Sequence, residues 1–174
     1  MIIYIIQEEG FSKVTVSIDL KINGRAYPVA VEPRKTLADT IREDCGLTGT
    51  NLGCEHGVCG ACTVLMDDEP VRSCLMFAVQ AADREIRTVE SLAPSETELH
   101  PMQQAFIDEH ALQCGFCTPG FLMLATSIYE NRPGVSEEEL RELLSSNLCR
   151  CTGYLNILKA VQSALGSSST TQHA

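Results

Sequence analysis

The chain has 174 residues, 44% of them hydrophobic, and a formal net charge of −10. This length and apolar content suffice for one or two modest cores, whereas the acidic balance argues against nucleic-acid binding, which favours a basic surface. No apolar stretch approaches the roughly 18 consecutive residues that a membrane span needs.

The first half of the chain predicts a small mixed α/β domain. Strands are expected over residues 14–22, 27–32, 63–66 and 86–89, with a further strand or short helix over 71–78. Asn23-Gly24 is a strong hairpin signal between the first two strands. Thr36 with Asp39 three residues later resembles a capping box, which predicts a helix that ends near Cys45.

Four cysteines after this helix have the spacing of an iron–sulfur ligand set. The set is Cys54, Cys59, Cys62 and Cys74, a C-x4-C-x2-C-x11-C pattern. The spacing C-x4-C-x2-C…C is typical of the plant-type ferredoxin site for a [2Fe–2S] cluster. The loop also holds Gly53, Gly57 and Gly60. Because glycine adopts positive φ at little cost, these residues let the loop turn its N–H groups towards a cluster.

The second half predicts four helices after a polar linker at 91–100. They are expected over residues 102–112, 118–130, 136–146 and 155–165. Pro119 suits the first turn of the second helix, and Ser136 with Glu139 forms a capping box for the third. The loops between the first and second and between the third and fourth helices carry a second cysteine set, Cys114, Cys117, Cys149 and Cys151. We predict a helical bundle with a second cluster between these loops.

The spacing within the second set suggests how it shares two irons. Cys149 and Cys151 are two residues apart, so in an extended backbone their side chains point the same way. We predict that they bind one iron together and that Cys114 and Cys117 bind the other. Alone, this set fits zinc as well as iron; beside the first set we favour iron–sulfur. The ninth cysteine, Cys45, is predicted to be a small buried hydrophobic residue.

With both sets in place, the chain closely resembles the small iron–sulfur subunit of the molybdenum hydroxylases. That family includes xanthine dehydrogenase, carbon monoxide dehydrogenase and the quinoline and nicotine oxidoreductases. The resemblance covers about residues 16–165 and rests on the motifs at 22–24, 47–50, 53–64, 72–74, 112–120 and 147–154. The Glu-His-Gly-Val loop at 55–58 is most similar to members that act on N-heterocycles.

The predicted elements and the resemblance together imply an α+β fold with two domains. Residues 1–90 would form a β-grasp, plant-type ferredoxin-like [2Fe–2S] domain, whose first 15 or so residues are an extension relative to the family pattern. Residues 91–165 would form a four-helix-bundle [2Fe–2S] domain. The polar segment 166–174 is predicted to be a disordered tail.

The resemblance also implies the cofactors and partners. It implies two [2Fe–2S] clusters here, a molybdopterin cofactor on a large subunit and FAD on a medium subunit, in a dimer of heterotrimers. Substrate would be hydroxylated with water-derived oxygen on the large subunit, and electrons would pass singly through the helical-domain cluster and the ferredoxin-like cluster to FAD. Gln113 and Cys151 would approach the pterin. We expect no catalytic acid, base or nucleophile; His56, His100 and His110 are candidates by residue type alone.

Two other hypotheses compete with the subunit reading. One is a free-standing electron carrier with two clusters, and the other is a zinc-stabilised interaction module. A simple plant-type ferredoxin needs only the first domain, so the second cysteine set favours the subunit. The start of the chain has neither a secretory signal nor an Arg-Arg pair, which argues against a disulfide framework and predicts a cytoplasmic location.

Overall fold

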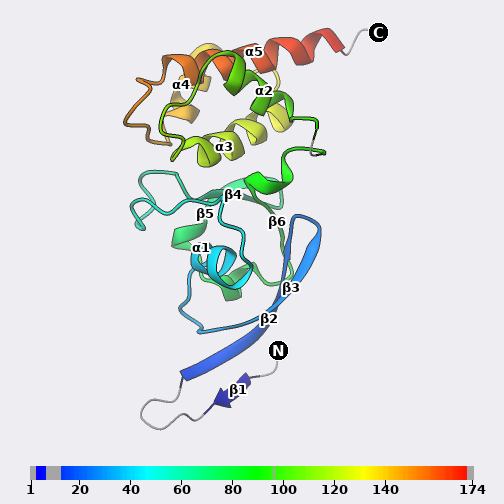
Figure 1. Ribbon diagram of the computed structural model, residues 1–174, viewed down its shortest axis with the longest axis vertical. Coiled ribbons are helices and arrows are strands. Elements are labelled where there is room, and N and C mark those ends of the chain that lie inside the picture. The colour runs from blue at the N-terminus through cyan, green and yellow to red at the C-terminus, as the bar shows by residue number, and fades with distance from the viewer. Residues whose placement is uncertain (1–2, 7–12, 96, 172–174) are drawn as a thin grey trace.

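A mixed β-sheet and a bundle of helices are stacked end to end in the computed structural model (Figure 1). The structure describes residues 3–6, 13–95 and 97–171. The N-terminal half of the chain builds the sheet half, and the C-terminal half builds the helical half (Figure 1). This arrangement confirms the predicted α+β fold class.

The sheet is mixed, and the pair of strands at its centre is parallel. Its described strands are β1 (Ile3–Ile6), β2 (Lys13–Ile22), β3 (Arg25–Val31), β4 (Thr63–Met66), β5 (Glu69–Arg72) and β6 (Glu85–Arg87). They follow the order β1-β2-β6-β4-β5, and β3 also pairs with β2. The β2–β3 turn has φ of 54° at Asn23 and 72° at Gly24, as a type I′ hairpin requires. Strand β6 runs parallel to β2, with Ile86 opposite Ile22.

The expected helix of the sheet half is short and changes pitch. Helix α1 (Leu37–Asp39) widens into a π-helical turn over Thr40–Asp44. As predicted, the Thr36 hydroxyl caps it by accepting the Asp39 N–H at 3.1 Å. The segment 71–78 resolves into the end of β5 and a 3₁₀ turn, Ser73–Leu75, which carries Cys74.

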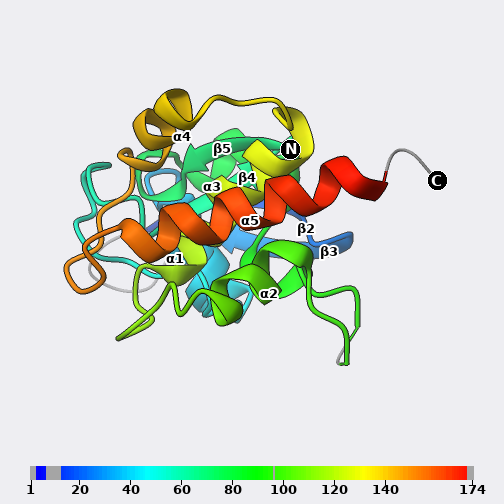
Figure 2. The same ribbon diagram turned by 90° about the horizontal axis from the view of Figure 1, so that it is seen from above.

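Four helices cover the described part of the C-terminal half. They are α2 (Pro101–Asp108), α3 (Thr118–Asn131), α4 (Glu137–Leu144) and α5 (Leu155–Thr171). Figure 2 shows α5 lying across the other helices. Helix α2 ends earlier than predicted, because His110 adopts the left-handed region with φ of 50°. Ser136 caps α4 as predicted, accepting the Glu139 N–H at 3.2 Å.

Both ends of the chain carry regular secondary structure beyond the predicted elements. The N-terminal extension supplies β1, where Ile3 pairs with Val16 of β2; residues 1–2 and 7–12 lie outside the described residues. Helix α5 continues to Thr171 instead of ending at Leu165. A single glycine such as Gly166 costs a helix only about 1 kcal/mol relative to alanine, too little to stop it. Residues 172–174 are not described.

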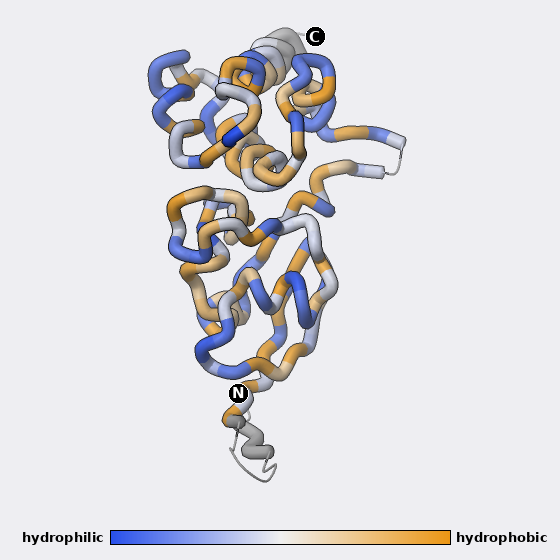
Figure 3. Tube along the Cα trace, turned by 60° about the vertical axis from the view of Figure 1, so that its left-hand side comes forward, coloured by the Kyte–Doolittle hydropathy of each residue, from blue (hydrophilic) through white to orange (hydrophobic). Residues whose placement is uncertain are grey.

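The cores of the two halves meet at β4. Val64 belongs to the core of the sheet half and Leu65 to the core of the helical half, and both are fully buried. Successive strand residues point to opposite faces, so β4 is covered on both sides, with α3 against its helical face. Hydrophobic residues recur through both halves in Figure 3. No described helix is both long and apolar enough to cross a membrane.

Candidate metal centres

The first cysteine set is gathered on the loop before β4 and on the turn after β5. The backbone N–H of Cys59 donates to Cys54 Sγ at 3.3 Å. The Cys62 and Cys74 thiols are in hydrogen-bonding contact, and Cys54 lies close enough to Cys74 to act on it electrostatically. The structure therefore brings together all four residues predicted for the first set.

Glycines shape this loop for two different reasons. Gly57 and Gly60 have φ of +85° and +72°, as predicted for a loop that turns its N–H groups inward. Gly53 does not have a positive φ. A Cβ there would lie 3.1 Å from Cys59 Sγ, so close approach to a cysteine explains this glycine.

The surroundings of the first set suit both a thiolate and a metal ion. Backbone N–H groups of Cys59 and His56 lower the pKa of the Cys54 thiol to about 6. Burial, followed by contact with Cys62, raises the pKa of Cys74 to about 11. A bound metal ion deprotonates a coordinating thiol outright. The buried Cys74 thiol therefore fits a ligand whose negative charge a metal neutralises.

The second cysteine set lies between two loops of the helical half. Cys114 and Cys117 precede α3, and Cys149 and Cys151 precede α5. The Cys149 sulfur accepts two hydrogen bonds from Thr152, from the backbone N–H at 3.4 Å and from the hydroxyl at 3.1 Å. Burial opposes ionisation of Cys149, but hydrogen bonds from Thr152, the Cys151 N–H and the Cys117 thiol together lower its pKa. Burial and then contact with Cys149 raise the pKa of Cys117 to about 12.

The thiols of the second set pair across the two loops. Cys117 contacts Cys149, and Cys114 contacts Cys151. These thiol contacts do not show which sulfurs share an iron, so the assignment of both ligands of one iron to each loop stays a prediction. The i, i+2 argument assumed an extended backbone, but Cys149 is buried whereas Cys151 is exposed, so the two side chains do not share one environment.

The Cys54 and Cys59 thiols are also in contact, so each set consists of two neighbouring thiol pairs. Among the described residues, no three or more His, Cys, Asp or Glu side chains are arranged to hold a single metal ion. A [2Fe–2S] cluster takes its four ligands as two on each of two irons. Two thiol pairs with inward N–H donors fit such a cluster.

The two sets meet at a junction, formed by residues 59–60 of the first loop and residues 146–148 after α4. The Leu148 N–H donates to the Cys59 carbonyl at 2.9 Å, and Asn147 Nδ2 donates to the Gly60 carbonyl at 3.3 Å. Arg72 adds a bond from Nη2 to the Ser146 carbonyl at 2.7 Å. Cysteine spacing gives no sign of this junction, because the spacing describes each set separately.

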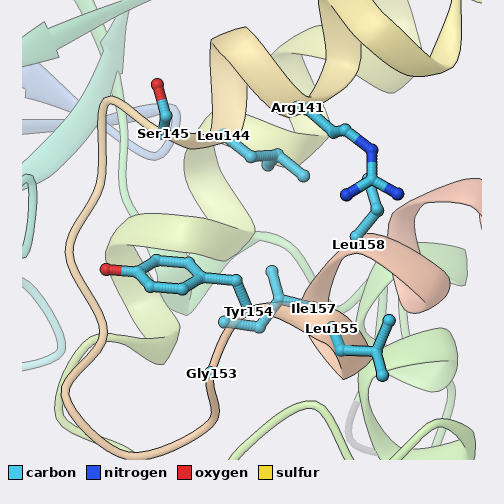
Figure 4. A pocket seen from close by; sticks show the side chains of 8 residues that line it. All are labelled: Arg141, Leu144, Ser145, Gly153, Tyr154, Leu155, Ile157 and Leu158. Atoms are coloured by element: carbon cyan, nitrogen blue, oxygen red, sulfur yellow. The ribbon is translucent and has the colours of Figure 1, made fainter.

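Exposed apolar side chains flank both sets. Around the second set they form the bundle rim: Leu112, Phe116, Leu148, Tyr154 and Leu155. Around the first set they form the loop rim: Val58, Leu75 and Phe77. Beside the bundle rim lies a hollow of about 410 Å³. Figure 4 shows Tyr154 and Leu155 at the start of α5 opposite Arg141 and Leu144 of α4 around it.

The three candidate histidines and Cys45 cap a helix, pack against a core or lie exposed. His100 is the N-cap of α2, where Nδ1 accepts the Met102 N–H at 3.1 Å. His110 is exposed, and His56 is exposed with Nδ1 2.5 Å from the Cys54 carbonyl oxygen. Cys45 packs against the core of the sheet half, and burial raises its pKa to about 11. The predicted apolar packing of Cys45 is confirmed, but the residue is partly rather than fully buried.

Comparison with known families defines the class first. Residues 20–93 match the family described as a 2Fe-2S iron-sulfur cluster binding domain, and residues 88–162 match the family described as a [2Fe-2S] binding domain. The chain is therefore a protein of two [2Fe–2S] domains. The two matched segments correspond to the sheet half and the helical half.

Longer comparisons identify the family. The chain is 59% identical over 151 residues to the nicotine 6-hydroxylase small subunit of Paenarthrobacter nicotinovorans, covering 87% of this chain and 90% of that one. It is 53% identical over 160 residues to caffeine dehydrogenase subunit gamma of Pseudomonas sp. (strain CBB1), covering 90% and 93%. It also superposes on a chain of quinoline 2-oxidoreductase from Pseudomonas putida 86 with a TM-score of 0.84 and 48% identity, covering 92% and 99%. The chain belongs to the small iron–sulfur subunits of the molybdenum hydroxylases.

Proposed function

We propose that the eight clustered cysteines hold two [2Fe–2S] clusters, through which this chain carries electrons between a molybdenum subunit and an FAD subunit. The first cluster would be held by Cys54, Cys59, Cys62 and Cys74, and the second by Cys114, Cys117, Cys149 and Cys151. One observation carries the proposal: a hydrogen bond of 2.9 Å joins Cys59 of the first set to Leu148, the chain neighbour of Cys149 in the second set. Two centres joined in this way suit a relay.

The residues of the chain would hold, orient and shield the clusters. A bound [2Fe–2S] cluster supplies one-electron chemistry at a potential set by hydrogen bonds to sulfur and by solvent exposure. Backbone N–H groups at Cys54 and the Thr152 donors at Cys149 supply such hydrogen bonds. Cys74 and Cys149 are buried from water, whereas Cys114 and Cys151 are exposed at the surface that a partner can approach.

The thiol contacts support an alternative assignment of ligands to irons. We propose that Cys117 and Cys149 share one iron of the second cluster and that Cys114 and Cys151 share the other, because these are the pairs in contact. The exposed pair would then lie on the outward iron. Cys114 and Cys151 would then hold the side of the cluster nearest the surface, and the buried Cys149 would hold the side shielded from water.

The two apolar rims suggest where the partners dock. We propose that the large molybdenum subunit covers the bundle rim, with Gln113 and Cys151 against the pterin; both residues are exposed. The medium FAD subunit would cover the loop rim, beside the first cluster. Exposed apolar patches are typical of protein–protein contacts. A dimer of such heterotrimers is the assembly that the family resemblance implies.

The relatives suggest a class of substrate for the whole enzyme. Nicotine and caffeine, named in two relatives, and quinoline, named in a third, all contain a nitrogen heterocycle. We propose that the complex containing this chain hydroxylates an N-heterocyclic compound. The residues that would recognise it belong to the large subunit.

Low-temperature EPR of the dithionite-reduced native complex tests the proposal, with iron and sulfide measured on the same sample. We expect two S = ½ signals and about four irons per chain, the content of two [2Fe–2S] centres. Cys151→Ala should lose the signal of the second centre, whereas the matched control Cys45→Ala should keep both signals. Zinc in place of iron, or one signal in the wild type, would overturn the proposal. Elution without larger chains would favour a free-standing carrier instead.

A further inference from the structure

Asn147 occupies an unusual position between the two cysteine sets. It follows α4, lies two residues before Cys149, and is only 1% exposed. Its Nδ2 donates to the carbonyl of Gly60, the neighbour of Cys59, at 3.3 Å. Its Oδ1 is buried without a hydrogen-bond partner among the described residues. A buried polar side chain with an unsatisfied atom costs stability, so this asparagine calls for a reason other than the stability of the fold.

A second bond runs beside the first. The Leu148 N–H donates to the Cys59 carbonyl at 2.9 Å, so residues 147 and 148 bind residues 60 and 59 respectively. Leu148 is covalently bonded to Cys149. One hydrogen bond and the backbone of one residue therefore separate a cysteine of the first set from a cysteine of the second.

A ring of hydrogen bonds closes around this contact. The Gly60 carbonyl also accepts the Thr63 hydroxyl at 2.6 Å. Arg72 donates from Nη1 to that same Thr63 hydroxyl oxygen and from Nη2 to the Ser146 carbonyl at 2.7 Å. Ser146 is bonded to Asn147, which returns the ring to Gly60. The ring fixes residues 146–148 against the first loop from two sides.

Two glycines are tightly packed at this contact. A Cβ on Gly60 would lie 2.2 Å from Asn147 Oδ1. A Cβ on Gly120, in α3, would lie 2.3 Å from the Gly60 carbonyl oxygen. Both glycines are needed for Asn147 and α3 to approach the same carbonyl group.

We propose that Asn147 is a positioning residue for electron exchange between the two centres: it holds the Gly60 carbonyl so that the Leu148–Cys59 hydrogen bond stays closed. This inference rests on the proposed function. Loss of the Asn147 side chain should let the junction open more often. Electron exchange through the junction should then slow, while each centre keeps its own four ligands.

The test compares Asn147→Ala with Glu130→Gln in the assembled complex. Glu130 of α3 pairs with Arg87 of β6 through two bonds of 2.8 Å, so it joins the same two halves away from the junction. We expect Asn147→Ala to keep wild-type iron content and both EPR signals. It should weaken the magnetic interaction between the two reduced centres and slow electron exchange between them severalfold. Glu130→Gln should leave both properties unchanged.

Amide hydrogen exchange at Leu148 gives a readout that does not depend on turnover. Loss of one neutral hydrogen bond should speed this exchange about fivefold in Asn147→Ala. Asn147→Ser, which keeps a hydroxyl group too short to reach Gly60, serves if the alanine variant loses iron. Wild-type exchange, coupling and electron transfer in both variants would overturn the inference, as would equal slowing by Glu130→Gln. A wild type without two [2Fe–2S] signals would instead overturn the proposed function itself.

Discussion

Gly60 has two constraints, a left-handed backbone and a buried contact, whereas Gly24 has only the first. Both have φ of +72°, but a Cβ on Gly24 would meet nothing within 4 Å. A left-handed conformation costs a residue with a Cβ roughly 1–2 kcal/mol. We therefore predict that Gly24→Ala lowers the free energy of unfolding by about that amount and that Gly60→Ala lowers it further. Urea unfolding of both variants measures the difference. Equal losses of stability would show that the Asn147 side chain can move away from a Cβ at position 60.

Gln113 offers a prediction about the partner rather than about stability. It is exposed and precedes the exposed Cys114, so its removal should leave the fold and the iron content unchanged. If Gln113 contacts the pterin, Gln113→Ala should slow reduction of the second centre after substrate is added to the complex. Stopped-flow absorbance measures that rate.

A matched control comes from the preceding helix. Gln104 is exposed on α2 and donates to Asp108 at 2.8 Å, away from either cysteine set. Gln104→Ala should keep the wild-type rate of reduction. Equal rates in both variants would assign Gln113 an ordinary surface role.

At the scale of elements, the cap of α2 makes stability depend on pH. Burial lowers the pKa of His100 below 6.5, with Arg87 lowering it further and Glu130 opposing. The neutral ring is the form that the fold uses, because its Nδ1 accepts the Met102 N–H. As pH falls below 6.5 the unfolded chain takes up a proton on His100 before the folded chain does, so the free energy of unfolding falls.

We predict that this loss of stability on acidification is smaller in His100→Asn, since asparagine also caps a helix but does not titrate. Urea unfolding at pH 7 and at pH 5 measures it. His110→Asn is the control, because His110 is exposed and asparagine tolerates its positive φ of 50°. A pH dependence that is unchanged in His100→Asn would contradict the argument.

Elements with local signals were predictable, and those set by tertiary contact were not. The turn at Asn23-Gly24 and the caps at Thr36 and Ser136 follow from short-range chemistry and agree with the structure. The end of α2 depends on the backbone at His110, for which histidine carries no strong signal. The thiol pairing across loops and the Asn147 contact depend on how two distant segments approach, which spacing along the chain does not encode.

At the scale of the whole molecule, ion pairs and shared core packing join the two halves, while the two apolar rims are exposed. Arg87 of β6 pairs with Glu130 of α3 and with Asp68 of the β4–β5 turn. Strand β4 contributes Leu65 to the core of the helical half. The bundle rim flanks the second set and reaches the first set at Leu148, whereas the loop rim flanks the first set. Two joined halves with an apolar rim at each centre suit a chain that contacts two partners.

The last prediction separates the two rims. Leu155 of the bundle rim is 56% exposed and Leu75 of the loop rim is 61% exposed, so a charge at either place costs the isolated chain little. Leu155→Asp should weaken binding of the molybdenum subunit and spare the FAD subunit, and Leu75→Asp should do the reverse, because a charge buried in an apolar interface lacks a partner. Pull-down of the tagged chain from cells that express all three subunits measures both. If either variant released both partners, or if neither released any, the rims would not be separate docking surfaces.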